Sequence, residues 1–454
     1  MSPIAKKKLF ETDGIRGRFG FYPITEEFAE RLGRAIGELL GLGLEESVIL
    51  IGRDTRISGT TLESFLVKGL VASGTSVQLL GVTSTPALAY SVKTFSAKGG
   101  VMISASHNPF QDNGFKLFGK NGEKVSQEIE LLLEEALARK KVRDPRGNSK
   151  ATVRYHPDWE AKYKDMCKSH FKAISGLEKI KIIVDCAHGS NYQLAADILR
   201  SCGLQVEQIG CKPNGYNINF SVGSTNPNLL RAAVINSHAP VGVGFDGDGD
   251  RLVMVDERGE VLDGDDILFV LANYYLSSNR RLGGVVGTLM TNLGLERSIV
   301  ELGLGFERVG VGDRFVMEKL NERGWALGGE TSGHVICRDI AATGDGLLAC
   351  LQVLSSMASS RRSLSELRKG LIKFPQVLVN VLVADKVKVL EAAALKKAVE
   401  QAKNTLGDSG RILVRASGTE SLIRVMLEGE DRKHINLVAG GVVKAIEEIN
   451  ARIS

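Results

Sequence analysis

Short runs rich in β-branched residues alternate with amphipathic segments over most of the chain, which is the pattern of α/β domains with largely parallel sheets. This alternation occurs three times in a similar form. Each copy has an apolar strand, a helical pattern that ends near glycine, a second strand, and later another apolar strand that leads into a polar, glycine-rich loop. The copies start near Ile49, Ile182 and Val285, and their loops are ISASHNP, FDGDGDR and GETSGH.

The stretch after the third copy has a different pattern. An apolar strand at residues 374–383 precedes a helical segment from Val389 to Leu406, a pair of strands around residues 415–429 and a closing helix. We therefore predict three similar mixed-sheet α/β domains and a smaller C-terminal α+β domain around a central cleft. The predicted domains are residues 1–157, 158–257, 258–372 and 373–454, and the charged segment 363–375 is the predicted hinge.

Corresponding strands deliver the three polar loops. Ligands of open α/β sheets bind beyond the carboxyl ends of the strands, so we expect the three loops to meet at one cleft. The candidate chemistry lies in these loops and in a fourth stretch, RASGTESLIR, near the C-terminus.

The composition narrows the class of protein. The chain has 454 residues, of which 43% are hydrophobic and 24% charged, as in ordinary globular proteins. A net charge of +5 with interleaved basic and acidic residues does not indicate a nucleic-acid partner. The six cysteines form no CxxC pair, which disfavours a zinc site or a disulfide framework. No apolar segment follows the basic start or reaches membrane-spanning length, so we expect no membrane contact and a cytoplasmic location.

The second loop carries three alternating carboxylates, Asp246, Asp248 and Asp250. Gly247 and Gly249 let the backbone curl, so the carboxylates can face one point and bind a hard cation such as Mg²⁺. A calcium EF-hand is the competing interpretation and places Glu257 at its twelfth position, but Arg251 stands where that loop needs glycine. A plain acidic turn is disfavoured because three carboxylates without a cation repel one another.

The C-terminal stretch combines fixed cations, hydroxyls and a permissive backbone whose N–H groups suit a phosphate. Its candidate residues are Arg415, Ser417, Gly418, Thr419 and Arg424. A polar hairpin turn with an exposed arginine is an equally good interpretation of so short a motif.

The third loop supplies Glu330, Ser332 and His334 at alternating positions. These side chains point to one side if the segment is extended, and such groups suit the hydroxyls of a sugar. A structural histidine in a polar turn is an equally good interpretation.

The first loop raises the question of what Ser106 does. Successive side chains of an extended segment diverge, so we do not expect His107 to act as its base, and no G-x-S-x-G elbow surrounds it. A serine that carries a phosphoryl group needs a metal and nearby cations, and Lys116, Arg16 and the Asp-rich loop are candidates. The alternative is a turn that ends a strand.

In order, the four stretches ISASHNP, FDGDGDR, GETSGH and RASGTES resemble the signature loops of the α-D-phosphohexomutase superfamily. TDGIRG at Thr12, GRDTRISG at Gly52, GTLMTNLGLE at Gly287 and VGDRFVMEK at Val311 are similar to motifs of its bacterial amino-sugar branch. The resemblance covers essentially the whole chain. It implies three α/β domains and a smaller fourth around a deep cleft. It also implies an isomerase that moves phosphate reversibly between O6 and O1 of a hexosamine phosphate, feeding UDP-N-acetylglucosamine and cell-wall synthesis.

The resemblance also implies roles for the candidate residues. Ser106 would carry the phosphoryl group, and one Mg²⁺ per chain would bind the phosphoserine and the carboxylates of Asp246, Asp248 and Asp250. Arg16 would neutralise charge on the transferring group. A hexosamine 1,6-bisphosphate would be the intermediate and activator.

Substrate binding and proton transfer follow from the same resemblance. Glu330 and Ser332 would bind sugar hydroxyls. The residues implied at the substrate's resident phosphate are Arg415, Ser417, Gly418 and Thr419, with Arg424 as a second cation. The candidates for the base and acid at the sugar hydroxyl are His107, Lys116 and His334, and the sequence does not rank them.

Three alternatives remain open. Thr331 stands where the amino-sugar enzymes often have Asn or Gln, so a sister enzyme acting on mannose or glucose phosphates is the runner-up. A hexose-phosphate sensor without catalysis and a metal phosphatase are further alternatives. The sequence is compatible with a monomer or a homodimer.

Overall fold

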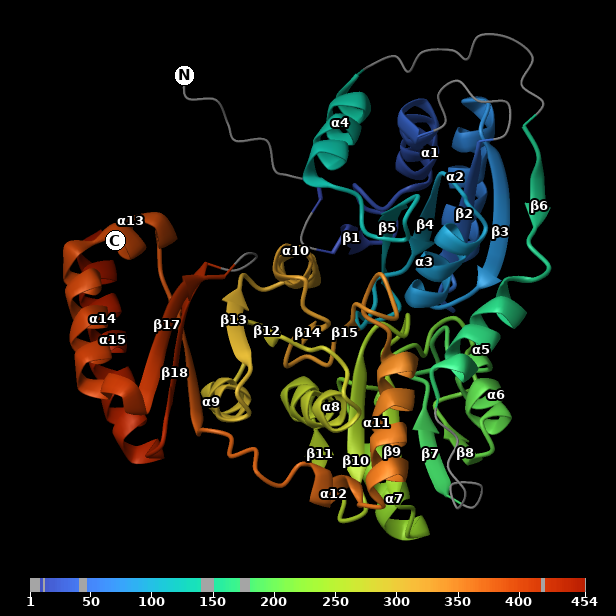
Figure 1. Ribbon diagram of the computed structural model, residues 1–454. Helices are drawn as coiled ribbons and strands as arrows, with labels where there is room; N and C mark the ends of the chain where they lie inside the picture. The colour runs from blue at the N-terminus through green and yellow to red at the C-terminus, as the bar shows by residue number, and fades with distance from the viewer. Residues whose placement is uncertain are drawn as a thin grey trace. The chain divides into compact units, whose positions relative to one another are not determined.

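The computed structural model describes residues 9–10, 13–40, 47–139, 151–171, 180–417 and 421–453 of the chain. The chain folds into two compact units (Figure 1). The first unit comprises Met1–Thr288 and Glu307–Lys369, and the second comprises Leu289–Phe306 and Gly370–Ser454. One boundary therefore falls inside the segment 363–375 that the sequence predicts as a hinge.

The first sheet has six strands in the order β1-β5-β4-β2-β3-β6. In it, β5 is antiparallel to both of its neighbours, β1 and β4. A continuous cluster of buried side chains joins α1, α2 and α4 to this sheet, and Gly33 of α1 lies against the backbone of Leu66 in α2. The elements are β1 (Ile15–Arg18), α1 (Glu26–Leu40), β2 (Val48–Arg53), α2 (Gly59–Ala72), β3 (Ser76–Val82), α3 (Thr85–Thr94), β4 (Gly99–Ile103), β5 (Asp112–Gly119), α4 (Gln127–Ala138) and β6 (Val153–Tyr155).

The second sheet has five strands in the order β11-β10-β9-β7-β8. Every residue of β9 and β10 and all but the first residue of β7 are buried, as expected for a sheet with helices on both faces. The elements are α5 (Trp159–Ser169), β7 (Lys181–Asp185), α6 (Leu194–Ser201), β8 (Gln205–Ile209), α7 (Asn228–Ser237), β9 (Val241–Phe245), β10 (Leu252–Asp256) and β11 (Val261–Leu262).

The third sheet has four strands in the order β13-β12-β14-β15. Nearly every residue of α8 and of α11 is buried, as expected for helices that are apolar around most of their circumference. The elements are α8 (Gly264–Ser277), β12 (Gly284–Thr288), α9 (Leu293–Glu301), β13 (Gly305–Val309), α10 (Asp313–Arg323), β14 (Leu327–Gly329), β15 (Val335–Cys337), α11 (Gly346–Ser360) and α12 (Leu364–Leu367).

The three sheets share one arrangement, which confirms the predicted repeat. The orders β5-β4-β2-β3, β10-β9-β7-β8 and β15-β14-β12-β13 correspond strand for strand. In each sheet the polar loop leaves the carboxyl end of one strand and returns along an antiparallel neighbour, as the pairs β4/β5, β9/β10 and β14/β15 demonstrate. Each candidate loop is therefore a connection between two adjacent antiparallel strands, so both of its ends are held by strand pairing.

The C-terminal domain contains an antiparallel three-stranded sheet in the order β16-β18-β17, and its core includes side chains of α14 and α15. Figure 1 shows these two helices beside β17 and β18. The predicted helix from Val389 to Leu406 is in fact two helices, because Ala392 has an extended backbone. The elements are β16 (Gln376–Leu382), α13 (Lys386–Glu391), α14 (Ala393–Leu406), β17 (Gly410–Ala416), β18 (Leu422–Gly429) and α15 (Arg432–Ile453).

Within the described ranges, none of the helices combines the length and the apolar character that crossing a bilayer requires.

Asp345 connects the start of α11 to α5. Its Oδ1 accepts a hydrogen bond from the backbone N–H of Leu348 (2.9 Å), and its Oδ2 accepts one from the hydroxyl of Tyr163 (2.7 Å). Burial raises the pKa of the Asp345 carboxyl to about 6, although the two hydrogen bonds act in the opposite direction.

We expect Asp345→Asn to remove a pH-dependent contribution to stability. Because the folded pKa exceeds that of an unfolded aspartate, the contribution is complete below about pH 4 and is lost as the pH rises through about 6. Across this window the wild type should lose stability relative to the variant, by up to about 3 kcal/mol. Urea unfolding midpoints of both proteins measure the difference, and a difference that does not change with pH would contradict the expectation.

Candidate active site

The first and second polar loops meet in the first unit. Ser106 follows β4 and Asp246 follows β9, and the Ser106 hydroxyl donates a hydrogen bond of 2.5 Å to Asp246 Oδ2. Ser106 and Asp246 are both fully buried. The candidate phosphoryl carrier thus lies directly beside the candidate metal loop, although the two residues are 140 positions apart in the sequence.

Ser106 has a left-handed backbone conformation, with φ of +53°. The segment is therefore a turn and not an extended strand, so the expectation that the side chains of Ser106 and His107 diverge was wrong. The Ser106 hydroxyl lies 3.3 Å from His107 Nδ1. Burial, together with the nearby Arg251 and Arg16, lowers the pKa of His107 to about 4. His107 is therefore a neutral imidazole at neutral pH.

The three aspartates form a group suited to a cation. One oxygen from each of Asp246, Asp248 and Asp250 lies within 4.8 Å of the others. In the described part of the chain, Asp248 Oδ1 and Asp250 Oδ1 are buried and accept no hydrogen bond. Buried carboxylate oxygens without donors match the ligand set that Mg²⁺ prefers. The flanking elements are strands, which excludes the EF-hand interpretation.

Burial and neighbouring charges shift the pKa values of these carboxyls in opposite directions. Burial, then Asp250 and Asp248, raise the pKa of Asp246 well above its usual range. Burial acts in the same direction on Asp250, but Lys116 and His334 outweigh it and hold the pKa of Asp250 well below its usual range. A divalent cation among the three carboxylates would relieve the repulsion.

Lys116 is the cation that connects β5 to the metal loop. Its Nζ lies 2.7 Å from Asp250 Oδ2, 2.8 Å from Asp248 Oδ2 and 3.1 Å from Asp13 Oδ2. The side chain is 1% exposed. Burial lowers the pKa of Lys116, but the three carboxylates outweigh burial and hold it well above the usual value, so the ammonium stays charged.

Arg16 is the second predicted cation and lies on β1, which pairs with β5. Its guanidinium forms an ion pair with Asp13 and donates a hydrogen bond of 3.3 Å to the carbonyl of Ala105, the residue before Ser106. The structure therefore brings Arg16 to the phosphoserine loop, here defined as residues 104–112.

The third loop contributes His334 to the same region. Its Nδ1 lies 3.7 Å from Asp250 Oδ1 and its Nε2 lies 3.4 Å from Asp313 Oδ2. Burial lowers the pKa of His334, but Asp313 and Asp250 outweigh burial and raise it to about 9. His334 is therefore an imidazolium at neutral pH, unlike His107.

Glu330, Ser332 and His334 do not share one face as predicted for an extended segment. The loop is a turn, closed by hydrogen bonds from Glu330 N to His334 O (2.9 Å) and from Gly333 N to Glu330 O (3.0 Å). Ser332 is exposed, whereas His334 is buried. Glu330 Oε1 accepts from the backbone N–H of Gly312 (3.0 Å), and burial raises the pKa of this carboxyl.

The candidate phosphate loop belongs to the second unit and is described by itself. Arg415 of β17 and Arg424 of β18 are direct partners across the antiparallel pair. Ser417 N donates to Leu422 O (2.9 Å) and closes the hairpin. Burial, then Arg424, lower the pKa of Arg415, as expected for neighbouring like charges. The predicted residues Gly418 and Thr419 lie outside the described residues.

Arg56 is a site residue that the sequence analysis did not single out. Its side chain is fully buried and donates hydrogen bonds to the carbonyls of Ser106 (2.9 Å), Asn108 (2.8 Å) and Asp112 (2.9 Å). It also pairs with Asp54 Oδ2 (2.8 Å). Arg56 therefore fixes the backbone of the phosphoserine loop.

Two further side chains support the same loop. The Ser104 hydroxyl donates to Asp54 and accepts from the backbone N–H of Ser106 (2.8 Å), and the amide of Asn219 donates to the Ser106 carbonyl (2.9 Å). The sequence signal for Asp54 and Arg56 was the motif GRDTRISG at the end of an apolar strand, where ligand-binding residues of α/β sheets lie. Asn219 carried no comparable signal.

Four domain models of one family match the chain in order. They are phosphoglucomutase/phosphomannomutase alpha/beta/alpha domain I at residues 7–144, domain II at 161–259, domain III at 263–374 and the C-terminal domain at 378–445. The chain therefore belongs to the phosphoglucomutase/phosphomannomutase family of phosphohexomutases, which confirms the predicted family and fold class.

Curated relatives narrow this class. The chain is 47% identical over 441 residues to the phosphoglucosamine mutase of Aeromonas hydrophila, with 97% of this chain and 99% of that protein covered. It is 48% identical over 444 residues to the phosphoglucosamine mutase of Methylococcus capsulatus, with 97% and 99% covered. Within the family, the chain groups with the phosphoglucosamine mutases.

Solved structures have the same fold. A phosphoglucomutase/phosphomannomutase family protein of Burkholderia thailandensis superimposes with a TM-score of 0.82 at 23% identity, covering 97% of each chain. The N-acetylphosphoglucosamine mutase of Aspergillus fumigatus, solved in complex with GlcNAc-6P and magnesium, has a TM-score of 0.69 at 18% identity, with 97% of this chain and 96% of that chain covered.

We expect Gly247→Ala to separate the phosphoserine loop from the metal loop. A Cβ at Gly247 would lie 2.5 Å from the Ser106 carbonyl oxygen and 2.8 Å from Ile218 Cδ1, so the backbone must shift. A shift of this kind costs on the order of a hundredfold in kcat. Gly440→Ala is the matched control, because nothing lies within 4 Å of a Cβ there. Equal mutase activity of the two variants would contradict the expectation.

Proposed function

We propose that this protein interconverts glucosamine 6-phosphate and glucosamine 1-phosphate, with Ser106 as the phosphoryl carrier. The observation that carries the residue assignment is the hydrogen bond between the Ser106 hydroxyl and Asp246, inside a buried group of three carboxylates. The substrate is inferred from two relatives named phosphoglucosamine mutase, which this chain matches over nearly their full length.

Asp246, Asp248 and Asp250 would hold one Mg²⁺ together with an oxygen of phosphorylated Ser106. A bound magnesium ion withdraws charge from the phosphoryl group and so lowers the barrier to its transfer. The buried oxygens of Asp248 and Asp250 that accept no hydrogen bond within the described residues support this assignment. Magnesium in the structure of the Aspergillus fumigatus relative supports the choice of ion.

The proposed reaction has two transfers. In the first, the free sugar hydroxyl loses its proton and attacks phosphorus, the bond from phosphorus to Ser106 Oγ breaks, and a 1,6-bisphosphate forms. The bisphosphate then turns over, and Ser106 Oγ takes the other phosphate while that sugar oxygen regains a proton. Both transfers are in-line displacements in which positioning and electrostatics supply most of the acceleration.

The chain's own cations would stabilise the transferring group. Arg16 reaches the carbonyl next to Ser106, and Lys116 is held among three carboxylates beside it. His107, Lys116 and His334 remain the candidates for proton transfer at the sugar oxygen. Of the three, His107 has the shortest distance to Ser106 Oγ that the structure gives, at 3.3 Å.

Substrate recognition would use the other two loops. Glu330 and Ser332 would bind sugar hydroxyls, since Ser332 is exposed and Glu330 is partly so. The residues proposed at the resident phosphate are Arg415, Ser417, Gly418, Thr419 and Arg424. Direct pairing of two arginines across β17 and β18 supports an anion site, because it concentrates positive charge beside this loop.

A comparison of glucosamine, glucose and mannose 6-phosphates as substrates tests this function. We expect the highest kcat/KM for glucosamine 6-phosphate, a loss of at least about a thousandfold in Ser106→Ala, and loss of activity with a magnesium chelator that returns on adding Mg²⁺. Ser91→Ala is the matched control, because Ser91 is also a buried serine but bonds within α3.

The outcomes distinguish the alternatives. Dominant turnover of glucose or mannose 6-phosphate would contradict the substrate, in line with the alternative based on Thr331. Release of free phosphate faster than isomerisation would indicate a phosphatase. Absence of phosphate on Ser106 after incubation with glucosamine 1,6-bisphosphate, measured by intact mass and site mapping, would indicate a sensor.

A further inference from the structure

Charged side chains of alternating sign form a closed ring in the first unit. One half of the ring belongs to the site described above: Lys116 lies between Asp13 and Asp250, and His334 lies next to Asp250. The other half is completed by Asp313, which faces His334, and by Lys124. The ring in order is Asp13, Lys116, Asp250, His334, Asp313 and Lys124.

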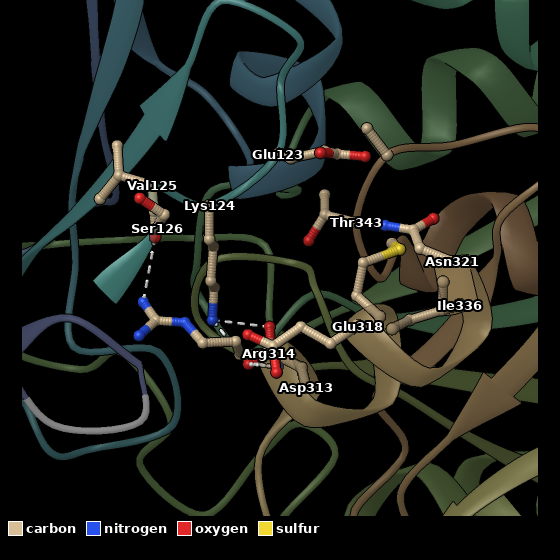
Figure 2. Close-up of a pocket in the computed structure, with 12 residues that line it drawn as sticks. Glu123, Lys124, Val125, Ser126, Asp313, Arg314, Glu318, Asn321, Ile336 and Thr343 are labelled. Atoms are coloured by element: carbon tan, nitrogen blue, oxygen red, sulfur yellow. Dashed lines mark hydrogen bonds and ion pairs between the residues drawn. The ribbon is translucent and has the colours of Figure 1, made fainter. Parts of the chain in front are cut away.

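Lys124 closes this ring. It lies between β5 and α4, and its Nζ is 2.5 Å from Asp13 Oδ1 and 2.6 Å from Asp313 Oδ2. Figure 2 shows its side chain extending toward Asp313 at the start of α10, along the wall of a cavity of about 180 Å³. Lys124 therefore joins a segment of the first α/β domain to a segment of the third.

Solvent screens these contacts weakly. The side chains of Lys124 and Asp313 are 12% and 9% exposed. Burial lowers the pKa of Lys124, but Asp13 and Asp313 outweigh burial and raise it. If the ammonium were removed, two nearly buried carboxylates would lose a shared partner, which is costly in a poorly solvated environment.

Asp313 connects Lys124 to His334. Its Oδ2 also lies 3.4 Å from His334 Nε2, and the other ring nitrogen of His334 faces the metal loop at Asp250. Gly344 leaves room for the imidazole, since a Cβ there would lie 2.2 Å from His334 Nε2. The position of His334 is thus determined by Asp313 on one side and Asp250 on the other.

We propose that Lys124 and Asp313 are positioning residues for phosphoryl transfer. By bridging Asp13 and His334, they hold the third loop against the phosphoserine loop and the metal loop. This inference rests on the proposed function, because it assigns the ring a role in transfer to and from Ser106.

A neighbouring ion pair provides a matched control. Arg314 follows Asp313 in the sequence, and its guanidinium donates to Glu130 of α4 (2.8 Å) and to the carbonyl of Val125 (3.3 Å). Figure 2 shows that Arg314 lines the same cavity as Lys124. The Arg314–Glu130 pair therefore also joins α10 to the region around α4. Neither Glu130 nor Val125, which the Arg314 guanidinium contacts, is a member of the ring.

The experiment compares Lys124→Met with Arg314→Met. The readout is the single-turnover rate at which glucosamine 1,6-bisphosphate phosphorylates Ser106, followed by intact mass, alongside the thermal midpoint. We expect Lys124→Met to slow this rate by about 10- to 100-fold, as removal of outer-shell partners does, and Arg314→Met to leave it within about threefold. Both variants should lower the thermal midpoint.

Two further variants make the test independent of folding losses. Asp313→Asn keeps the shape of the side chain and should slow phosphorylation to a similar extent, so it carries the prediction if Lys124→Met does not fold. The double variant Lys124→Met/Asp313→Asn should be little slower than either single variant, because both remove the same bridge.

The outcomes separate this inference from the proposed function. A wild type that is not phosphorylated on Ser106 contradicts the proposed function and, with it, the role of the ring. A phosphorylated wild type with equal rates in Lys124→Met and Arg314→Met contradicts the ring alone, because the bridge would then only stabilise the fold.

Discussion

The site depends on balancing negative charge that is buried away from water. Asp246, Asp248 and Asp250 are nearly inaccessible to solvent, and a group of carboxylates in such a place is stable only when cations lie among them. Lys116 supplies one of these charges from β5 and thereby ties the first α/β domain to the second. Burial, followed by repulsion from Asp250 and Asp248, raises the pKa of Asp246, and a bound magnesium ion would offset both effects by favouring the charged carboxylate.

Backbone contacts hold the phosphoryl carrier in the geometry that this charge arrangement needs. Arg56 is fully buried, and its guanidinium donates hydrogen bonds to carbonyls of the phosphoserine loop. If the loop moved away, a buried guanidinium would lose these hydrogen-bond partners, which is costly. In this arrangement Ser106 has a left-handed backbone conformation and Gly247 lies close to its carbonyl. Geometry fixed before substrate binds avoids reorganisation during transfer.

The sequence predicted the parts of this site that follow from periodicity. Three copies of one strand and helix pattern implied three equivalent sheets with a polar loop at the carboxyl end of a corresponding strand. Ser106 and Asp246 follow such strands in the first and second sheets, and their loops meet as expected. It did not predict side-chain directions within the loops. The turn at Glu330 to His334 and the contact of Ser106 with His107 depend on local backbone dihedral angles, which residue types leave open. The contact between Lys124 and Asp313 joins residues 189 positions apart, and no periodic pattern marks it.

Each unit places charged side chains where the proposed reaction would use them. In the first unit, cations and carboxylates of the chain compensate one another, so the machinery around Ser106 is largely complete before substrate binds. In the second unit, Arg415 and Arg424 are direct partners across β17 and β18, which concentrates positive charge beside the proposed phosphate loop. A mutase that works through a bisphosphate must hold either phosphate in turn at the end remote from Ser106. An anion site built from fixed positive charges accepts both, because it recognises the phosphate and not the position of the sugar that carries it.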